Sequence, residues 1–186
     1  VVSGGIIPTT LELMDKTIID LIRGIGGAKF PFDAESALLI EVDGDEASVE
    51  RQSKKVANFC KKQGALSIQL ARSPKEADEL WEARRAIAGA VYKVSPNLIT
   101  EDAVVPVSKL PEMIKRIKKL SEKYRLKVGV VAHAGDGNLH PDIMTDVRKE
   151  DEMARVEKFI REMYEVVISL GGTLSGEHGI GIGKDK

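Results

Sequence analysis

The sequence predicts an α+β sandwich, in which helices pack on one face of a mainly antiparallel sheet. Two patterns lead to this prediction. Amphipathic helical segments alternate with short apolar runs along most of the chain, and residues 127–145 have the pattern of strand, glycine-rich turn and strand. Long helical crossovers combined with one local hairpin are typical of an α+β domain rather than of a parallel α/β sheet.

The composition limits the class of protein. The chain has 186 residues, 42% of them hydrophobic and 31% charged, and a formal net charge of -1. These values are typical of a globular domain with one core, and they carry no basic excess that would indicate a nucleic-acid partner. The single cysteine, Cys60, excludes a disulfide framework and a CxxC redox pair.

No apolar run approaches the ~20 residues that a membrane-spanning helix needs, and residues 1–10 lack the layout of a signal peptide. We therefore expect a cytoplasmic protein, with peripheral association at a membrane left open.

The first element expected is a lead-in helix within residues 1–36. Thr9 and Glu12 form a capping-box pattern, and the apolar-periodic run that follows ends at Gly24. Residues 37–186 are then expected to form the main domain.

Two strands flank the next helix. Residues 37–44 (ALLIEVDG) are a short apolar run closed by a turn, which predicts a buried strand. Residues 45–63 have helical periodicity and end at Gly64, a typical C-terminal stop. Residues 65–71 (ALSIQLA) predict a second strand.

The middle of the chain continues with a helix and a strand. Ser73, Pro74 and Glu76 supply an N-cap, a first-turn proline and the capping-box acid for a helix that is expected to reach Val94. Residues 97–107 (NLITEDAVVPV) predict the strand that follows it.

The last third has two further helices around the hairpin. Ser108 and Pro111 open a helix that runs to Tyr124. Residues 151–170 form the other helix, which ends at a glycine pair, and residues 173–186 are expected to be a loop with at most a short strand.

All three histidines lie in this last third, and two of them, His133 and His140, flank the glycine-rich turn. A tight hairpin return, which the glycines permit, would bring these two imidazoles together across the strands. Glu177 would complete a set of three ligands with vacant positions, a pattern typical of a catalytic zinc, manganese or iron(II) ion. A lone histidine is more often a surface or satisfied core residue, but the clustering favours a site. Asp136 is a competing ligand, although it is better suited to order the turn.

His178 is expected to have a different role from its neighbour Glu177. Adjacent side chains in an extended chain point to opposite faces, so His178 would not reach the same ion and would be available as a general base. The alternative is that it only caps the loop.

Arg84 falls on the apolar stripe of its helix, in line with Trp81 and Ile87. A buried guanidinium requires an anionic partner. That partner is either an internal acid, such as Asp102 or Glu101, or the carboxylate of a bound substrate, and both alternatives stay open.

The glycine runs at residues 24–27 and 179–183 do not fit the GxGxxG or GxxxxGK[ST] patterns in the required strand, turn and helix setting. The sequence therefore offers no nucleotide cradle, and its cofactor-binding residues are unknown.

Four strings occur in order along the chain: WEARRAI, ITEDAVVPV, HAGDGNLHP and SGEHGIGIGK. Together they resemble the C-terminal domain of FAD-linked oxidases of the glycolate oxidase and D-lactate dehydrogenase type, over nearly the whole chain. The HxGDGNLH and GEHG pair is the most specific part of the resemblance.

The resemblance implies a ferredoxin-like α+β domain beside a separate FAD-binding domain. It implies that His133, His140 and Glu177 bind the metal, that His178 is the base and that Arg84 binds the substrate carboxylate. The implied reaction oxidises a 2-hydroxy acid to the 2-oxo acid, with hydride transfer to the flavin. The small side chains at Ala88 and Thr100 favour glycolate or lactate over larger dicarboxylates.

Several expectations concern what this chain would need. Relative to the family, the FAD-binding domain is expected to be absent before Val1 and the C-terminus to be truncated at Lys186, so the isolated chain is expected to be inactive. A partner FAD-binding domain or subunit is then required, an iron–sulfur electron-transfer partner is compatible with the family, and a homodimer is left open. The rival hypotheses are a stand-alone metal-dependent hydrolase and a non-catalytic assembly module.

Overall fold

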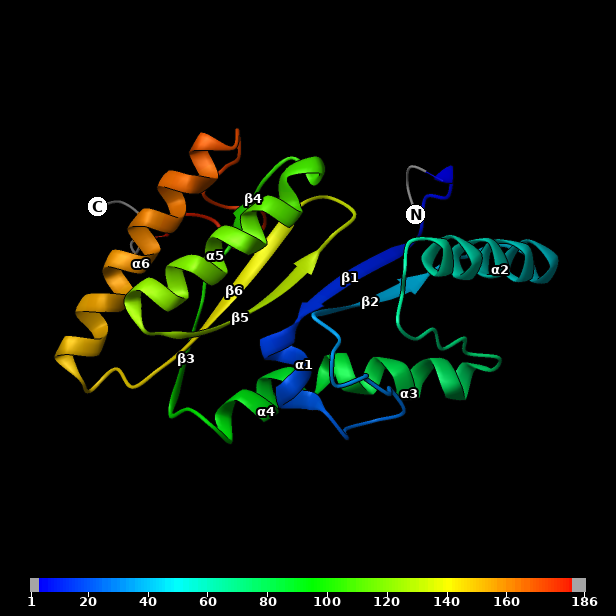
Figure 1. Ribbon diagram of the computed structural model, residues 1–186, viewed down its shortest axis with the longest axis horizontal. Coiled ribbons are helices and arrows are strands. Elements are labelled where there is room, and N and C mark those ends of the chain that lie inside the picture. The colour runs from blue at the N-terminus through cyan, green and yellow to red at the C-terminus, as the bar shows by residue number, and fades with distance from the viewer. Residues whose placement is uncertain (1–3, 182–186) are drawn as a thin grey trace. The chain divides into compact units, whose positions relative to one another are not determined.

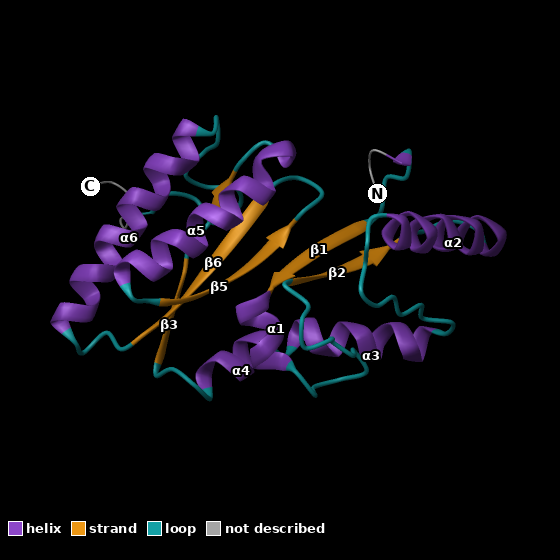
Figure 2. Cartoon of the chain, in the orientation of Figure 1, coloured by secondary structure: helices purple, strands orange, loops and turns teal. Residues whose placement is uncertain are grey.

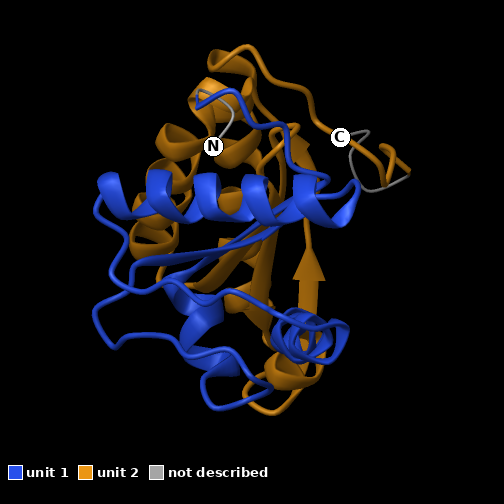
Figure 3. Cartoon of the chain, turned by 90° about the vertical axis from the view of Figure 1, so that its right-hand side faces the viewer, with its two compact units in different colours: residues 1–87 blue, residues 88–186 orange. Residues whose placement is uncertain are grey.

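The computed structural model describes residues 4–181 (Figure 1). The chain divides into two compact units, residues 1–87 and residues 88–186 (Figure 3). Helices and antiparallel strands occur in both units (Figure 2). This confirms the predicted α+β class with a mainly antiparallel sheet.

The first unit pairs β1 (Thr10–Asp15) with β2 (Ser36–Glu41) in antiparallel register, Thr10 opposite Glu41 and Asp15 opposite Ser36. Asp15 also caps α1 (Lys16–Ile22), because its carboxylate accepts a hydrogen bond from the Ile18 N–H. The unit also contains two longer helices, α2 (Glu46–Lys62) and α3 (Pro74–Arg85).

The second unit contains the remaining elements. They are α4 (Ile87–Tyr92, beginning at the boundary), β3 (Asn97–Thr100), β4 (Ala103–Val104), η2 (Val107–Lys109), α5 (Leu110–Tyr124), β5 (Lys127–His133), β6 (Asn138–Thr145) and α6 (Glu150–Ser169). β6 lies in the centre, between β5 on one side and β3 with β4 on the other, and every pairing is antiparallel.

The sheet of the second unit has one apolar and one polar face. Helices α5 and α6 lie side by side and contact β5 and β6, which buries Met113, Ile117, Phe159 and Met163 (Figure 1). Leu139 and Ile143 of β6 alternate along the strand with His140 and Asp142, so the polar residues lie on the opposite face. The apolar core of this unit therefore lies between the helices and the sheet, and the polar side chains of β6 lie on the other face of the sheet.

The helices α2, α5 and α6 and the hairpin of β5 and β6 confirm the sequence predictions. Each has strong local signals. α2 begins after its N-cap Asp45 and ends before Gly64, which has a left-handed φ of 84°.

The predicted lead-in helix starting at Thr9 is wrong in its first half. Residues Thr10–Asp15 form strand β1, and the helix begins only after Asp15. The capping-box pattern of Thr9 and Glu12 is not used as a cap, because pairing with β2 satisfies the backbone groups of this segment.

Three further predictions need correction. Residues 65–71 are not a strand: their side chains are exposed, and Gln69 instead bonds the backbone of Lys29 and Gly27. β2 is a strand but not a buried one, since Leu38 is 47% exposed. The helix predicted to reach Val94 is divided at Ala86, which turns Ala88 outward.

The strand predicted over residues 97–107 is also interrupted. β3 ends at Thr100 and β4 starts at Ala103, so Glu101 and Asp102 form a corner between them. The Glu101 N–H donates to the Pro141 carbonyl, and Asp102 is 1% exposed. This corner places a carboxylate next to the loop that follows α6.

The hairpin turn requires glycine at one position. Gly137 has a φ of 85°, and a Cβ there would overlap the carbonyl oxygen of Val105. We expect Gly137→Ala to destabilise the chain by about 1–3 kcal/mol more than Gly171→Ala. Gly171 has a φ of 79° with nothing near its Cβ position, so it controls for backbone strain alone. Urea unfolding of the two variants measures this difference, and equal losses would show that the Val105 contact is unimportant.

Candidate metal centre

The β5–β6 hairpin positions the first two histidines. His133 is the last residue of β5 and lies opposite Asn138, and His140 follows two positions later on the same face of β6. The turn closes through Gly137 N–H, which donates to the His133 carbonyl at 3.0 Å, and through Asn138 N–H, which donates to Asp136 Oδ1 at 3.0 Å. Asp136 therefore orders the turn, as expected from the sequence.

Glu177 joins the two histidines from the loop after α6. Its Oε1 lies 3.2 Å from His140 Nε2 and 3.8 Å from His133 Nε2. The two imidazole rings meet edge to face, with centroids 5.2 Å apart. One ligand atom from each of the three residues lies within 4.8 Å of the others, so a single ion can reach all three.

The side chain of His178 does not point away from Glu177. Its Nε2 lies 3.4 Å from Glu177 Oε1, and its ring stacks on that of His140 with centroids 5.0 Å apart. The expected opposite orientation is wrong because residues 176–178 are not extended: three consecutive backbone N–H groups turn toward one oxygen of Asp102. His178 lies within the same cluster as Glu177.

A second group of potential ligands overlaps the first. Asp102, His140 and His178 also offer ligand atoms within 4.8 Å of one another. His140 belongs to both groups, so it is the central residue of the cluster. Asp136 belongs to neither group.

Burial prepares His140 to act as a ligand. The residue is 8% exposed, and this burial, with the neighbouring His133 and His178, lowers its pKa, while Glu177 and Asp102 oppose the shift. The neutral imidazole that results carries the lone pair a metal requires. Its Nδ1 is buried and has no hydrogen-bond partner among residues 4–181. Two imidazoles and a carboxylate fit zinc, manganese or iron(II).

Arg84 has an internal acidic partner, Glu12, which the sequence did not predict. Its Nε donates to Glu12 Oε2 at 3.0 Å within the first unit, and the Glu12 side chain is 8% exposed. Within the second unit, Asp102 bonds Ser175 and Glu101 bonds Tyr164. An internal acid therefore pairs with Arg84, which is the first of the two alternatives, and a substrate carboxylate as a further partner stays a prediction.

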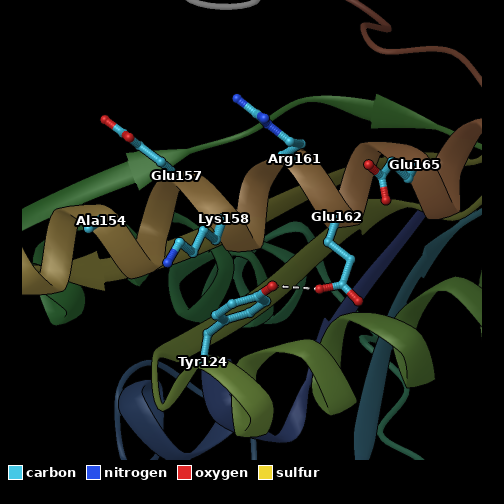
Figure 4. Close-up of a pocket in the computed structure, with 7 residues that line it drawn as sticks. All are labelled: Tyr124, Ala154, Glu157, Lys158, Arg161, Glu162 and Glu165. Carbon is cyan, nitrogen blue, oxygen red and sulfur yellow. Dashed lines mark hydrogen bonds between the residues drawn. The ribbon is translucent and has the colours of Figure 1, made fainter.

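One pocket lies on the outer surface of α5 and α6, away from the histidines (Figure 4). Tyr124, at the end of α5, donates a hydrogen bond of 2.6 Å to Glu162 there. The rest of the lining is mainly charged side chains of α6, and none of the predicted site residues contributes to it.

The sequence did not predict two residues that support the cluster. Asp102 accepts hydrogen bonds from the loop that carries Glu177, and Ser175 supplies one of them. The signal for Asp102 was an acidic pair within the apolar run ITEDAVVPV, which is costly unless its charge is satisfied. No local signal identified Ser175, whose hydroxyl donates to Asp102 across 73 positions of sequence. Residues 182–183 of the last glycine run lie outside the described part of the chain.

None of the helices among residues 4–181 is both long and apolar enough to cross a membrane.

Comparison with known proteins identifies a family over the same residues. The family described as FAD linked oxidases, C-terminal domain, matches residues 1–186. The chain is 43% identical over 181 residues to the glycolate oxidase subunit GlcD of Bacillus subtilis, which covers 97% of this chain and 38% of the relative. It is 38% identical over 181 residues to that of Escherichia coli K12, covering 97% and 36%. It is 35% identical over 185 residues to a mitochondrial D-lactate dehydrogenase (cytochrome) of Arabidopsis thaliana, covering 98% and 32%. The chain thus spans less than two fifths of the length of these relatives.

Proposed function

Because the chain belongs to the FAD linked oxidases, C-terminal domain family, we propose that it is the substrate- and metal-binding part of a flavin-dependent 2-hydroxy-acid dehydrogenase. The observation that carries the proposal is that His133, His140 and Glu177 offer ligand atoms within 4.8 Å of one another. The names of the relatives, glycolate oxidase subunit and D-lactate dehydrogenase, support glycolate or D-lactate as the substrate class. The FAD would be held by an FAD-binding domain or subunit that works with this chain.

His133, His140 and Glu177 are the residues that would hold the divalent cation. When bound, such a cation supplies Lewis-acid polarisation of the substrate hydroxyl. The chain provides the rigid positions for it: two histidines on paired strands and a carboxylate on a loop bonded to the same sheet. Ligands held in fixed positions would keep the cation, and the substrate bound to it, in the geometry that the reaction needs.

His178 is the proposed general base. Its side chain is 49% exposed, so a substrate can approach Nε2 and give up its hydroxyl proton there. Arg84 is the proposed carboxylate ligand. Its Nε donates to Glu12 Oε2 at 3.0 Å, and a planar guanidinium suits bidentate recognition of a carboxylate.

The general-base role predicts a large kinetic effect without loss of metal. In enzyme assembled with its FAD-binding partner, we expect His178→Gln to slow anaerobic flavin reduction by glycolate or D-lactate about 10²–10⁴-fold, the usual contribution of general base catalysis. Flavin absorbance in stopped flow measures the rate, and elemental analysis of the same sample measures the bound metal.

An unchanged rate of flavin reduction in His178→Gln would contradict the assignment of His178 as the general base. Absence of flavin reduction by any 2-hydroxy acid in the assembled wild-type enzyme would contradict the proposed function. Lys109→Gln, at an exposed residue before α5, is the control for a change of surface charge.

A further inference from the structure

One oxygen of Asp102 binds three consecutive backbone N–H groups of the loop that carries Glu177 and His178. Asp102 Oδ2 accepts the hydroxyl of Ser175 at 2.7 Å and the backbone N–H groups of residues 176, 177 and 178 at 2.9, 3.0 and 2.8 Å. Ser175 Oγ also accepts the Gly179 N–H at 2.7 Å. These bonds form a cradle, which we define as Asp102 with residues 175–178.

The cradle is stable because a charge lies at its centre. Burial alone would raise the pKa of the Asp102 carboxyl, but the hydrogen bonds from Ser175 and the three backbone N–H groups hold that pKa well below its usual range. Hydrogen bonds to an ionised carboxylate are roughly twice as strong as those between neutral groups. A neutral side chain at position 102 would hold the loop much less firmly.

The corner that carries Asp102 is itself fixed from two sides. The hydroxyl of Tyr164, on α6, lies 2.5 Å from Glu101 Oε2 and 3.2 Å from the Asp102 carbonyl oxygen. Val104 and Thr173 exchange two backbone hydrogen bonds, of 3.1 and 2.9 Å. Thr173, at the start of the loop, is therefore attached to β4. Residues 176–178, which include the candidate ligand Glu177, are attached to Asp102.

We propose that Asp102 is the positioning residue of the candidate metal centre: it fixes residues 176–178 so that Glu177 meets His133 and His140. This proposal rests on one part of the proposed function, the binding of a cation by His133, His140 and Glu177, and not on the dehydrogenase reaction. Asp102 lies close enough to His140 and His178 to be weighed as a ligand itself. Its Oδ2 accepts four hydrogen bonds from the loop, which supports the positioning role, whereas a ligand role would use the other carboxylate oxygen, Oδ1. The test below separates the two roles.

The test compares three variants of the 186-residue chain. Asp102→Asn removes the charge but keeps the shape, and Ser175→Ala removes one donor from the cradle without touching any candidate ligand. Asp146→Asn is the matched control: Asp146 is also a buried carboxylate in this unit, and it accepts the Arg148 N–H and guanidinium at the far end of β6.

Two quantities are measured for each variant. Amide hydrogen exchange at residues 176–178 is followed in chelator-treated protein, and the Kd for Zn²⁺ is determined by competition with a chelating dye. Asp102→Asn is expected to accelerate the exchange at least about tenfold and to weaken Zn²⁺ binding about 10–100-fold, as loss of a supporting residue typically does. Ser175→Ala should show the same two changes to a smaller extent, and Asp146→Asn neither.

An unchanged rate of amide hydrogen exchange at residues 176–178 in metal-free Asp102→Asn overturns the proposal. If Zn²⁺ binding nevertheless falls in that variant, Asp102 acts as a ligand and not as a positioning residue. If Asp102→Asn does not fold, Ser175→Ala decides by the same criterion. A wild-type chain that binds no Zn²⁺ contradicts the proposed function, while the exchange measurement still decides the role of Asp102.

Discussion

Removing the imidazole of His140 is expected to weaken divalent-cation binding by more than about 100-fold, since the loss of a supporting residue alone typically costs 10–100-fold. His140 is the residue shared by both groups of potential ligands, so no alternative set within the cluster replaces it. The Kd of His140→Ala for Zn²⁺, measured by chelator competition, tests this expectation.

The variant must also remain folded for this result to be meaningful. Metal-free His140→Ala and metal-free wild type should show the same far-ultraviolet circular dichroism, and added Zn²⁺ should raise the unfolding temperature of the wild type only. A His140→Ala chain with the affinity of the wild type would show that the cation, if one binds, lies elsewhere.

Truncating Phe159 is expected to cost about 3–5 kcal/mol of unfolding free energy, the usual range for Phe→Ala in a core. Phe159 is fully buried on α6, in the layer between the helices and the sheet of the second unit. Its loss leaves a cavity beneath the strands that carry the histidines.

Ile168→Ala is the matched control for Phe159→Ala, because Ile168 lies on the same helix and is 56% exposed. We expect it to change stability by less than about 0.5 kcal/mol. Urea unfolding of both variants gives the comparison. Similar losses would mean that the inner face of α6 does not pack as described.

The parts of the fold that could be predicted from sequence are those with strong local signals. α5 and α6 follow from apolar periodicity, and the β5–β6 hairpin follows from a glycine-rich turn between two apolar runs. Thr10–Asp15 could not be predicted in this way, since its strand conformation depends on pairing with residues 36–41, a contact that no local window contains.

The candidate site shows the same division. The approach of His133 and His140 was predictable from the hairpin, because register places them on one face. The orientation of His178 was not, since it depends on Asp102, 76 positions earlier in the chain. The partner of Arg84, Glu12, is 72 positions away and lies in the segment that the sequence predicted to be helical.

The most direct test of the candidate metal centre is the number of divalent ions bound per chain in His133→Ala and in His178→Ala, beside the wild type. Each protein is stripped with a chelator, reloaded, desalted and measured by elemental mass spectrometry. We expect one ion per chain for the wild type and for His178→Ala, and almost none for His133→Ala. A wild type that retains no ion, or a His133→Ala chain that keeps its ion while His178→Ala loses it, would contradict the assignment of His133, His140 and Glu177.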